Sequence, residues 1–274
     1  MRTLFISDLD GTLLRPDGRL SPFTIDTLNG LTQRGVHFSY ATARSIHSAS
    51  VVTHGLHVPT PVIVYNGAFI IRPDTRELVD VSLFGESDAA EALRLMIDHG
   101  VYPLVYALMD GRECVSYHSA HVTPGVAAYL ASRQKDKRLR PVADVSQLFA
   151  GDIFYFSCID TEQQLGPLHP HFAKDRRFNC VFHKDIYPPY AHWLELMPRR
   201  ASKGKAILRL KEMLQCQRVV CFGDGLNDLP MFAIADESYA VENAVPALKE
   251  AATAVIPANT EDGVAHFLAE RFGL

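Results

Sequence analysis

This chain of 274 residues has the composition of an ordinary globular protein, with 47% hydrophobic residues, 21% charged residues and a formal net charge of −4. Its length allows one large domain or two moderate ones. The charge excludes the strongly basic surface of an electrostatic nucleic-acid binder. No apolar run approaches the roughly 18 residues of a membrane span, so we expect neither a nucleic-acid nor a membrane partner.

The first part of the chain alternates between strand and helix patterns. Residues 3–7 are apolar and rich in β-formers, which predicts a buried strand. A serine-proline start and a glycine stop predict a helix within residues 21–35. A second strand follows in residues 36–42, and residues 61–71 have the pattern strand, turn, strand. This β-α-β order is typical of a parallel sheet.

The middle of the chain, residues 81–190, has an α+β pattern instead. It contains the densest basic run, residues 133–140, which we interpret as a solvated loop. We expect helices at residues 89–99, 126–133 and 161–174, and strands at 104–107, 113–117, 152–158 and 178–183. The pattern indicates a domain inserted into the sequence of another.

The alternating pattern returns in the last part of the chain. WLELM, residues 193–197, is expected to be the strand by which the chain rejoins the first sheet. A helix begins at Ser202, and residues 218–222 form a strand. Short strands are expected at residues 238–241 and 254–256, and helices from about residue 245 and at 264–272. We therefore predict an α/β fold: a Rossmann-like parallel core from residues 1–80 and 191–274, with an inserted α+β domain at 81–190.

Polar residues stand at the ends of three predicted core strands. Asp8 and Asp10 follow the first, Thr42 ends the second, and Asp224 and Asp228 follow the strand at 218–222. Open parallel sheets bind ligands at the carboxyl ends of their strands, so these residues should converge. Four carboxylates there would repel one another, and a divalent cation would relieve this. Carboxylate and carbonyl oxygens suit Mg²⁺.

Simpler interpretations exist for each motif taken alone. DLDG and GDGLND are both good turn sequences. DLDGTLL lacks the third acidic or amide ligand and the later glutamate of an EF-hand calcium loop. Lys203 stands at a helix start, which is unfavourable against the helix dipole unless an anion lies nearby; a solvated lysine is the alternative. The two acidic motifs together, each at a strand end, favour a site.

Four motifs resemble those of the haloacid dehalogenase-like (HAD) superfamily. They are, in order, DLDGTL at 8–13, ATAR at 41–44, SKG at 202–204 and GDGLND at 223–228. NGA at 66–68 further resembles the Cof-type sugar-phosphate phosphatase branch of that superfamily. The long interval between the second and third motifs agrees with a cap domain inserted there. The segment SYAVENA carries Glu242 where the family usually has glycine.

The resemblance implies a role for each matching residue. Asp8 would be the nucleophile that forms an aspartyl-phosphate, and Asp10 would be the general acid and base. Asp8, Asp224 and the backbone carbonyl of Asp10 would hold Mg²⁺. The phosphoryl oxygens would be bound by Thr42, Lys203, Asn227 and the backbone N–H groups of Leu9 and Ala43. Supporting roles fall to Asp228, which would orient Lys203 or a metal-bound water, and to Gly11, which allows a tight turn.

Arg44 and Asn66 stand beside matching motifs. Each is either a contact to the phosphate or substrate, or a partner in a local hydrogen bond. The sequence leaves this choice open.

The expected function is that of a cytoplasmic Mg²⁺-dependent phosphatase of small phosphomonoesters, with sugar phosphates as leading candidates. The five cysteines are scattered and contain no CxxC pair, and no signal peptide is evident, which agrees with a reducing compartment. A phosphomutase or phosphotransferase is one alternative. A non-catalytic sensor of a phosphorylated ligand is another, although a sensor has no need of the acid and base Asp10. The sequence specifies neither the substrate nor the oligomeric state.

Overall fold

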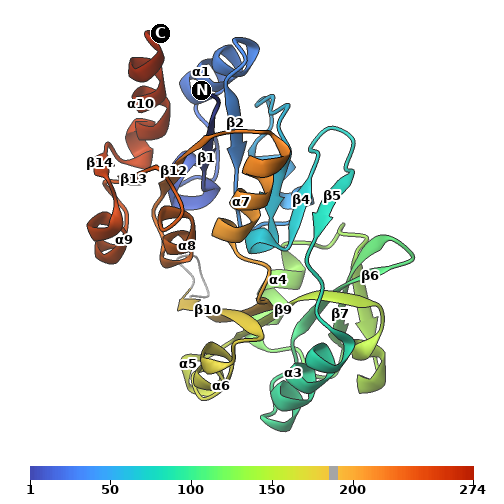
Figure 1. Ribbon diagram of the computed structural model, residues 1–274. Coiled ribbons are helices and arrows are strands. Elements are labelled where there is room, and N and C mark those ends of the chain that lie inside the picture. Colours follow the sequence, from blue (N-terminus) through green and yellow to red (C-terminus); the bar gives the residue numbers. More distant parts are fainter. Residues whose placement is uncertain (185–190) are drawn as a thin grey trace. The chain divides into compact units, whose positions relative to one another are not determined.

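The computed structural model describes residues 1–184 and 191–274 (Figure 1). The chain forms two compact units. The first unit contains residues Met1–Val81 and Ala201–Leu274, and the second contains Ser82–Arg200. The chain therefore leaves the first unit once and returns to it once, with both ends of the sequence in the first unit.

The first unit is built on a five-stranded sheet in which every pairing is parallel. In spatial order its strands are β14 (Ala254–Ile256), β13 (Glu237–Val241), β12 (Arg218–Gly223), β1 (Thr3–Ser7) and β2 (His37–Tyr40). Leu4 and Ile6 of β1 are fully buried, because a central parallel strand is covered on both faces. The predicted α/β class with a parallel core sheet is confirmed.

The helices of the first unit connect these strands. They are α1 (Pro22–Gln33), α2 (Ile46–Val52), α7 (Lys203–Met213), α8 (Leu229–Phe232), α9 (Pro246–Ala251) and α10 (Gly263–Phe272). As expected, Ser21 caps α1 and Ser202 caps α7, each by accepting a backbone N–H in the first turn. Beside the main sheet lies a small antiparallel one, formed by β3 (Val62–Val64), β4 (Phe69–Ile71) and β5 (Leu78–Val81).

The second unit contains a six-stranded sheet that is antiparallel except for one parallel pair, β7 with β8. In spatial order its strands are β10 (Phe178–Lys184), β11 (His192–Pro198), β9 (Asp152–Asp160), β6 (Leu104–Met109), β7 (Arg112–His118) and β8 (Leu139–Val142). Its helices are α3 (Glu86–Asp98), α4 (Pro124–Ala131), α5 (Glu162–Leu165) and α6 (His169–Lys174). Leu93 of α3, Phe172 of α6 and Phe156 of β9 belong to its buried core.

The strand WLELM differs from the expectation. We predicted it as a core strand, but it lies in β11, which pairs antiparallel with β10 and β9 of the second unit. Leu194 and Leu196 are buried in the core of that unit. Alternating apolar residues fit either sheet, so the pattern alone could not assign the strand. The chain returns to the first unit after Arg200, and the boundary expected at residue 190 lies outside the described residues.

Two smaller differences have local causes. The helix expected over residues 161–174 is two short helices, α5 and α6, which are separated at Gly166 and Pro167. Strand β8 was not expected because it contains Pro141, a residue that sheets accept mainly at their edges. β8 is indeed an edge strand of the second sheet.

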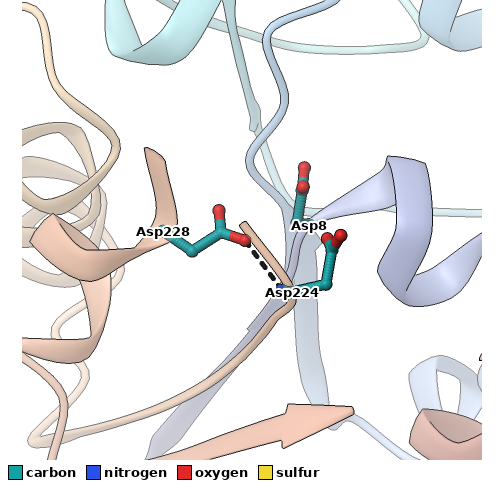
Figure 2. A group of neighbouring side chains, drawn as sticks. All are labelled: Asp8, Asp224 and Asp228. Atoms are coloured by element: carbon teal, nitrogen blue, oxygen red, sulfur yellow. Dashed lines mark hydrogen bonds between the residues drawn. The ribbon is translucent and has the colours of Figure 1, made fainter. Parts of the chain in front are cut away.

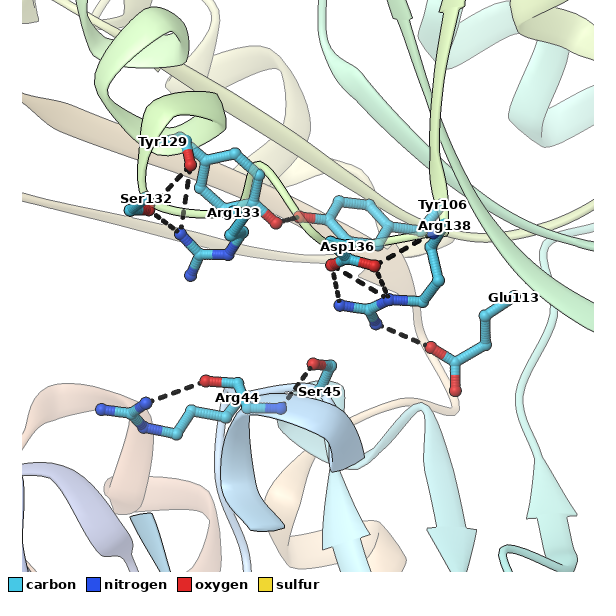
Figure 3. A network of polar contacts seen from close by, with 10 residues as sticks. Arg44, Ser45, Tyr106, Glu113, Tyr129, Ser132, Arg133, Asp136 and Arg138 are labelled. Atoms are coloured by element: carbon cyan, nitrogen blue, oxygen red, sulfur yellow. Dashed lines mark hydrogen bonds and ion pairs between the residues drawn. The ribbon is translucent and has the colours of Figure 1, made fainter. Parts of the chain in front are cut away.

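The basic run at residues 133–140 is less solvated than we expected. Arg138 has only 10% of its side chain exposed and forms ion pairs with Asp136 at 2.6 Å and Glu113 at 2.9 Å (Figure 3). The guanidinium of Arg133 lies 3.8 Å from the centre of the Tyr129 ring. Arg138 is thus neutralised by ion pairs and Arg133 is stacked on a ring, whereas Lys135 and Lys137 of the same run are exposed. Among the residues described, no helix combines the length and apolarity needed to cross a bilayer.

Candidate active site

Asp8 and Asp224 lie side by side because β1 and β12 are neighbours (Figure 2). The backbone N–H of Asp8 donates to the carbonyl of Phe222 at 2.9 Å, which continues the parallel pairing beyond the end of β1. The turn that follows, Leu9–Leu13, passes close to Asp224. A Cβ atom at Gly11 would overlap Asp224 Oδ2, and Gly11 also has a φ of 77°. Only glycine fits this position without strain.

Asp228 completes a group of three carboxylates with Asp8 and Asp224. One oxygen from each of the three lies within 4.8 Å of the other two. Both oxygens of Asp228 already have partners. Oδ1 accepts from Lys203 Nζ at 2.7 Å, and Oδ2 accepts from the backbone N–H of Asp224 at 2.9 Å (Figure 2). Asp228 is fully buried. It therefore contacts both the lysine and the turn that carries Asp224. That Asp228 orients Lys203 or a metal-bound water stays a prediction from the resemblance.

Lys203 supplies the positive charge of the site. It is the first residue of α7, it is 1% exposed, and its Nζ lies 2.9 Å from Asp8 Oδ1. Burial on its own would lower the pKa of Lys203, but the charges of Asp228 and Asp8 outweigh burial and raise it. The lysine therefore stays protonated at neutral pH. Its position at a helix start is explained by these two anions.

The carboxylates still carry more negative charge than Lys203 can balance. Burial raises the pKa of Asp8 well above its usual value; Lys203 opposes the shift, and the neighbouring aspartates add to it. Burial and the charge of Asp228 raise the pKa of Asp224 to about 6. Buried, hard oxygen donors with excess negative charge fit a small divalent cation. The residues present are therefore suited to the Mg²⁺ that the motifs imply.

Asp10 faces a different partner. Arg44 donates to both of its oxygens, from Nε to Oδ2 at 2.7 Å and from Nη2 to Oδ1 at 2.6 Å. Nη1 of the same guanidinium donates to Ser48 of α2 at 2.9 Å. Such a two-pronged pair fixes the orientation of a carboxylate as well as its position. Two roles were left open for Arg44, a contact to the phosphate or substrate and a local hydrogen bond. In the structure it makes local hydrogen bonds, to the Asp10 carboxylate.

The segment from Thr42 to Arg44 is held by the turn that contains Asn66. Thr42 is fully buried, and its carbonyl accepts from the backbone N–H of Asn66 at 2.9 Å. Tyr65 and Asn66 both have a φ of 51°, in the left-handed region. This conformation costs a residue other than glycine roughly 1–3 kcal/mol. A Cβ atom at Gly67 would overlap the carbonyl of Ser202, next to Lys203. The turn thus connects the second and third motifs.

The remaining predicted residues lie around the same centre. Asn227 Nδ2 is 3.5 Å from Asn66 Oδ1, which joins the turn at Asn66 to the GDGLND segment. Leu9 directly follows Asp8 and is fully buried, while Ala43 lies between Thr42 and Arg44 and is half-buried. The first unit thus brings the four motifs together.

Two contributing residues were not assigned from the sequence. Thr12 donates its hydroxyl to Asp224 Oδ1 at 2.8 Å, and Asn243 donates its amide to the carbonyl of Gly11 at 2.7 Å. Thr12 stands inside the first motif, so its position was a usable signal. Asn243 stands in the segment SYAVENA, which was compared with the family but given no role, and its residue type alone indicates only a turn.

Comparison with known proteins gives consistent results. A family model described as haloacid dehalogenase-like hydrolase matches residues 5–268. The chain is 24% identical to the Bacillus subtilis 5-amino-6-(5-phospho-D-ribitylamino)uracil phosphatase YitU, over 99% of this chain and 98% of that protein. It is 25% identical to the Escherichia coli pyridoxal phosphate phosphatase YbhA, over 95% of each.

Solved structures show the same fold. A haloacid dehalogenase-like hydrolase from Bacteroides thetaiotaomicron superposes with a TM-score of 0.79 at 22% identity, covering 99% of this chain and 100% of that one. A protein from Thermotoga maritima superposes with a TM-score of 0.77 at 25% identity, covering 98% and 97% of the two chains.

Proposed function

Because this chain belongs to the haloacid dehalogenase-like hydrolases, as its motifs predicted, we propose that it is a Mg²⁺-dependent phosphatase acting through an aspartyl-phosphate. Its substrates would be small phosphorylated metabolites, with sugar phosphates as leading candidates. One observation carries the proposal: a fully buried lysine lies between Asp8 and Asp228, next to Asp224. An enclosed cation beside paired carboxylates suits the transfer of a phosphoryl group.

In the first step an oxygen of Asp8 would attack phosphorus, and the bond between phosphorus and the ester oxygen would break. Asp10 would donate a proton to the departing alkoxide. In the second step water would attack the aspartyl-phosphate, Asp10 would take a proton from that water, and Asp8 would be released with inorganic phosphate. Both oxygens of Asp10 accept from Arg44 in the structure, so one of these two contacts would have to open before Asp10 could carry a proton.

The charge on the phosphoryl group must be neutralised before an anionic carboxylate can attack it. Mg²⁺, held by Asp8, Asp224 and the backbone carbonyl of Asp10, would supply part of that positive charge. Lys203 would supply a further part, since its Nζ lies 2.9 Å from Asp8 Oδ1. The phosphoryl oxygens would also be bound by Thr42, by Asn227 and by the backbone N–H groups of Leu9 and Ala43.

The proposal also assigns a role to the second unit and a cellular compartment to the enzyme. The second unit would act as the cap that selects the leaving group, since it carries none of the four motifs. The enzyme would work in the cytoplasm, and its five free cysteines agree with a reducing compartment.

The test is phosphate release from a panel of esters, with Mg²⁺ and with EDTA. The panel contains sugar phosphates, nucleotides, pyridoxal 5′-phosphate and an aryl phosphate. We expect Mg²⁺-dependent release that falls by at least about a thousandfold in Asp8→Asn. Asp10→Asn should lose most turnover on alkyl esters and less on the aryl ester, because a phenolate leaves without a proton. Metal-independent release, or full activity in Asp8→Asn, would refute the proposal.

A further inference from the structure

A short loop after β13, residues 242–245, contacts both acidic motifs. Asn243 Nδ2 donates to the carbonyl of Gly11 at 2.7 Å. Two residues later, the backbone N–H of Val245 donates to the carbonyl of Asp224 at 2.9 Å. One loop, outside all four motifs, therefore holds the backbone of the first motif and the backbone of the fourth.

The orientation of the Asn243 side chain is fixed from its other end. Its Oδ1 accepts from the backbone N–H of Asn259 at 3.0 Å, so its Nδ2 is the atom that faces Gly11. Asn259 is 6% exposed, and its own amide donates to the carbonyl of Leu14 at 2.7 Å. Two asparagines thus hold the turn that follows Asp8, one near the acidic residues and one at the far end.

The position of Gly11 bears directly on the acidic group. The Gly11 Cα is so close to Asp224 that a Cβ atom would overlap the carboxylate. The next residue, Thr12, donates its hydroxyl to Asp224 Oδ1 at 2.8 Å. A shift of the Gly11 peptide would therefore change both the packing and the hydrogen bonding of Asp224.

The carboxylates themselves oppose this arrangement. Asp8 and Asp224 are like charges in a largely buried place, with one lysine between Asp8 and Asp228. Their repulsion would separate the two motifs unless the backbone resisted it. The pairing of β1 with β12 resists this separation at the strand ends. The contacts of Asn243 and Val245 add to it at the carbonyls of Gly11 and Asp224.

We propose that Asn243 is a positioning residue, which holds the Gly11 peptide against Asp224 and so presets the spacing of the ligands for a divalent cation. This inference rests on the proposed function, since Mg²⁺ is the ion that the site would hold. The side chain of Asn243 donates to the Gly11 carbonyl and accepts from the Asn259 backbone, so it would act on the site through Gly11. Its loss should weaken the binding of Mg²⁺ in the absence of any substrate.

The experiment is a calorimetric titration of Mg²⁺ into the full-length protein, with thermal unfolding in EDTA recorded for each variant. Asn243→Ala should raise the Kd for Mg²⁺ by about fivefold, the size expected for one lost hydrogen bond. Asn259→Ala is the matched control. It removes an amide contact to the same turn, at Leu14, but keeps the backbone N–H that orients Asn243. It should lower the melting temperature and leave the Kd unchanged.

The outcomes distinguish a failure of the role given to Asn243 from a failure of the proposed Mg²⁺-dependent function. An unchanged Kd in Asn243→Ala would overturn the inference, as would equal weakening in both variants in proportion to their loss of melting temperature. Asn243→Ser is a second variant that is also too short to reach Gly11, and it answers the same question if Asn243→Ala is insoluble. Asp224→Asn tests the premise. If wild-type protein shows no Mg²⁺ binding that Asp224→Asn abolishes, the proposed function fails and the inference falls with it.

Discussion

Each unit of the molecule contains a cation that holds more than one carboxylate, and burial distinguishes the two. Lys203, in the first unit, has 1% of its side chain exposed and lies 2.9 Å from Asp8 and 2.7 Å from Asp228. Arg177, in the second unit, is 41% exposed. The lengths of the contacts are similar, so length alone does not reveal which cation belongs to a reactive site.

The exposed cluster contains more contacts than the buried one. Arg177 forms ion pairs with Asp175 at 2.7 Å, Asp88 at 3.0 Å and Glu91 at 2.6 Å. Water and salt screen these charges, so such pairs contribute little to stability. Around Lys203 water is largely excluded, and each charge acts strongly on its neighbours. Burial alone does not identify a reactive site, because Arg138 of the second unit is also only 10% exposed and pairs with Asp136 and Glu113. Lys203 differs in that a third carboxylate, Asp224, lies beside its two partners.

The largest effect is expected from Lys203→Met. The change keeps the length of the side chain but leaves Asp8 and Asp228 buried without a cation. We expect phosphatase activity to fall by about a hundredfold to a thousandfold. The free energy of unfolding should fall by about 3–5 kcal/mol, as when one partner of a buried pair is removed. Steady-state kinetics and urea denaturation at pH 7.5 measure the two effects.

Lys205→Met is the matched control for that variant. Lys205 lies two residues further along α7 and is exposed. It should change both quantities only slightly. A loss of activity in Lys205→Met as large as in Lys203→Met would show that α7, rather than the buried charge, is what matters.

An intermediate effect concerns pH in the metal-free protein. Burial and the charge of Asp228 raise the pKa of Asp224 to about 6 from its usual 3.8. Between about pH 4 and pH 6 the folded protein therefore binds more protons than the unfolded chain, and this contribution to the free energy of unfolding decreases as pH rises. Urea denaturation in EDTA across this pH range, for wild type and Asp224→Asn, measures the contribution of Asp224 to the free energy of unfolding. The stability of wild type relative to Asp224→Asn should fall with rising pH. A rise would contradict the assigned shift.

The smallest effect is expected from Arg177→Met. Because the cluster around Arg177 is screened, the melting temperature should change by about 2 °C or less. The kcat/KM for an aryl phosphate should not change. Repeating the melt in 0.5 M NaCl, a condition chosen to screen exposed charges, should shrink the difference further. If Arg177→Met destabilised the protein as much as Lys203→Met, the distinction between the two clusters would fail.

The candidate site was more predictable from the sequence than the second unit. Asp8 follows a short apolar strand and Asp224 follows another, and parallel strands bring such ends together. The order of the four motifs then predicted that Thr42 and Lys203 belong to the same site. In the second unit the only signals were apolar alternation and turns. These fit more than one sheet, and WLELM was therefore assigned to the wrong one.

Side-chain partners were the least predictable feature of the site. The sequence left Arg44 with two roles, because its side chain could contact either the substrate or a neighbouring residue. The structure pairs it with Asp10. Asn243 lies in SYAVENA, the segment compared above with the family, but the sequence assigned it no role, since its contact with Gly11 depends on the path of a loop after β13. Motifs indicate which atoms perform the chemistry, whereas the residues that hold those atoms depend on tertiary packing.

The pairing of β1 with β12 also sets an order of events during synthesis. Thr3 to Ser7 of β1 are translated before their partners in β12, Arg218 to Phe222. The whole of Ser82–Arg200 is translated in between. The second unit is therefore complete before β1 gains this neighbour. Asp8 therefore meets Asp224 only after the second unit has been translated, and a nascent chain that ends before residue 224 carries only one of the three carboxylates of the acidic group.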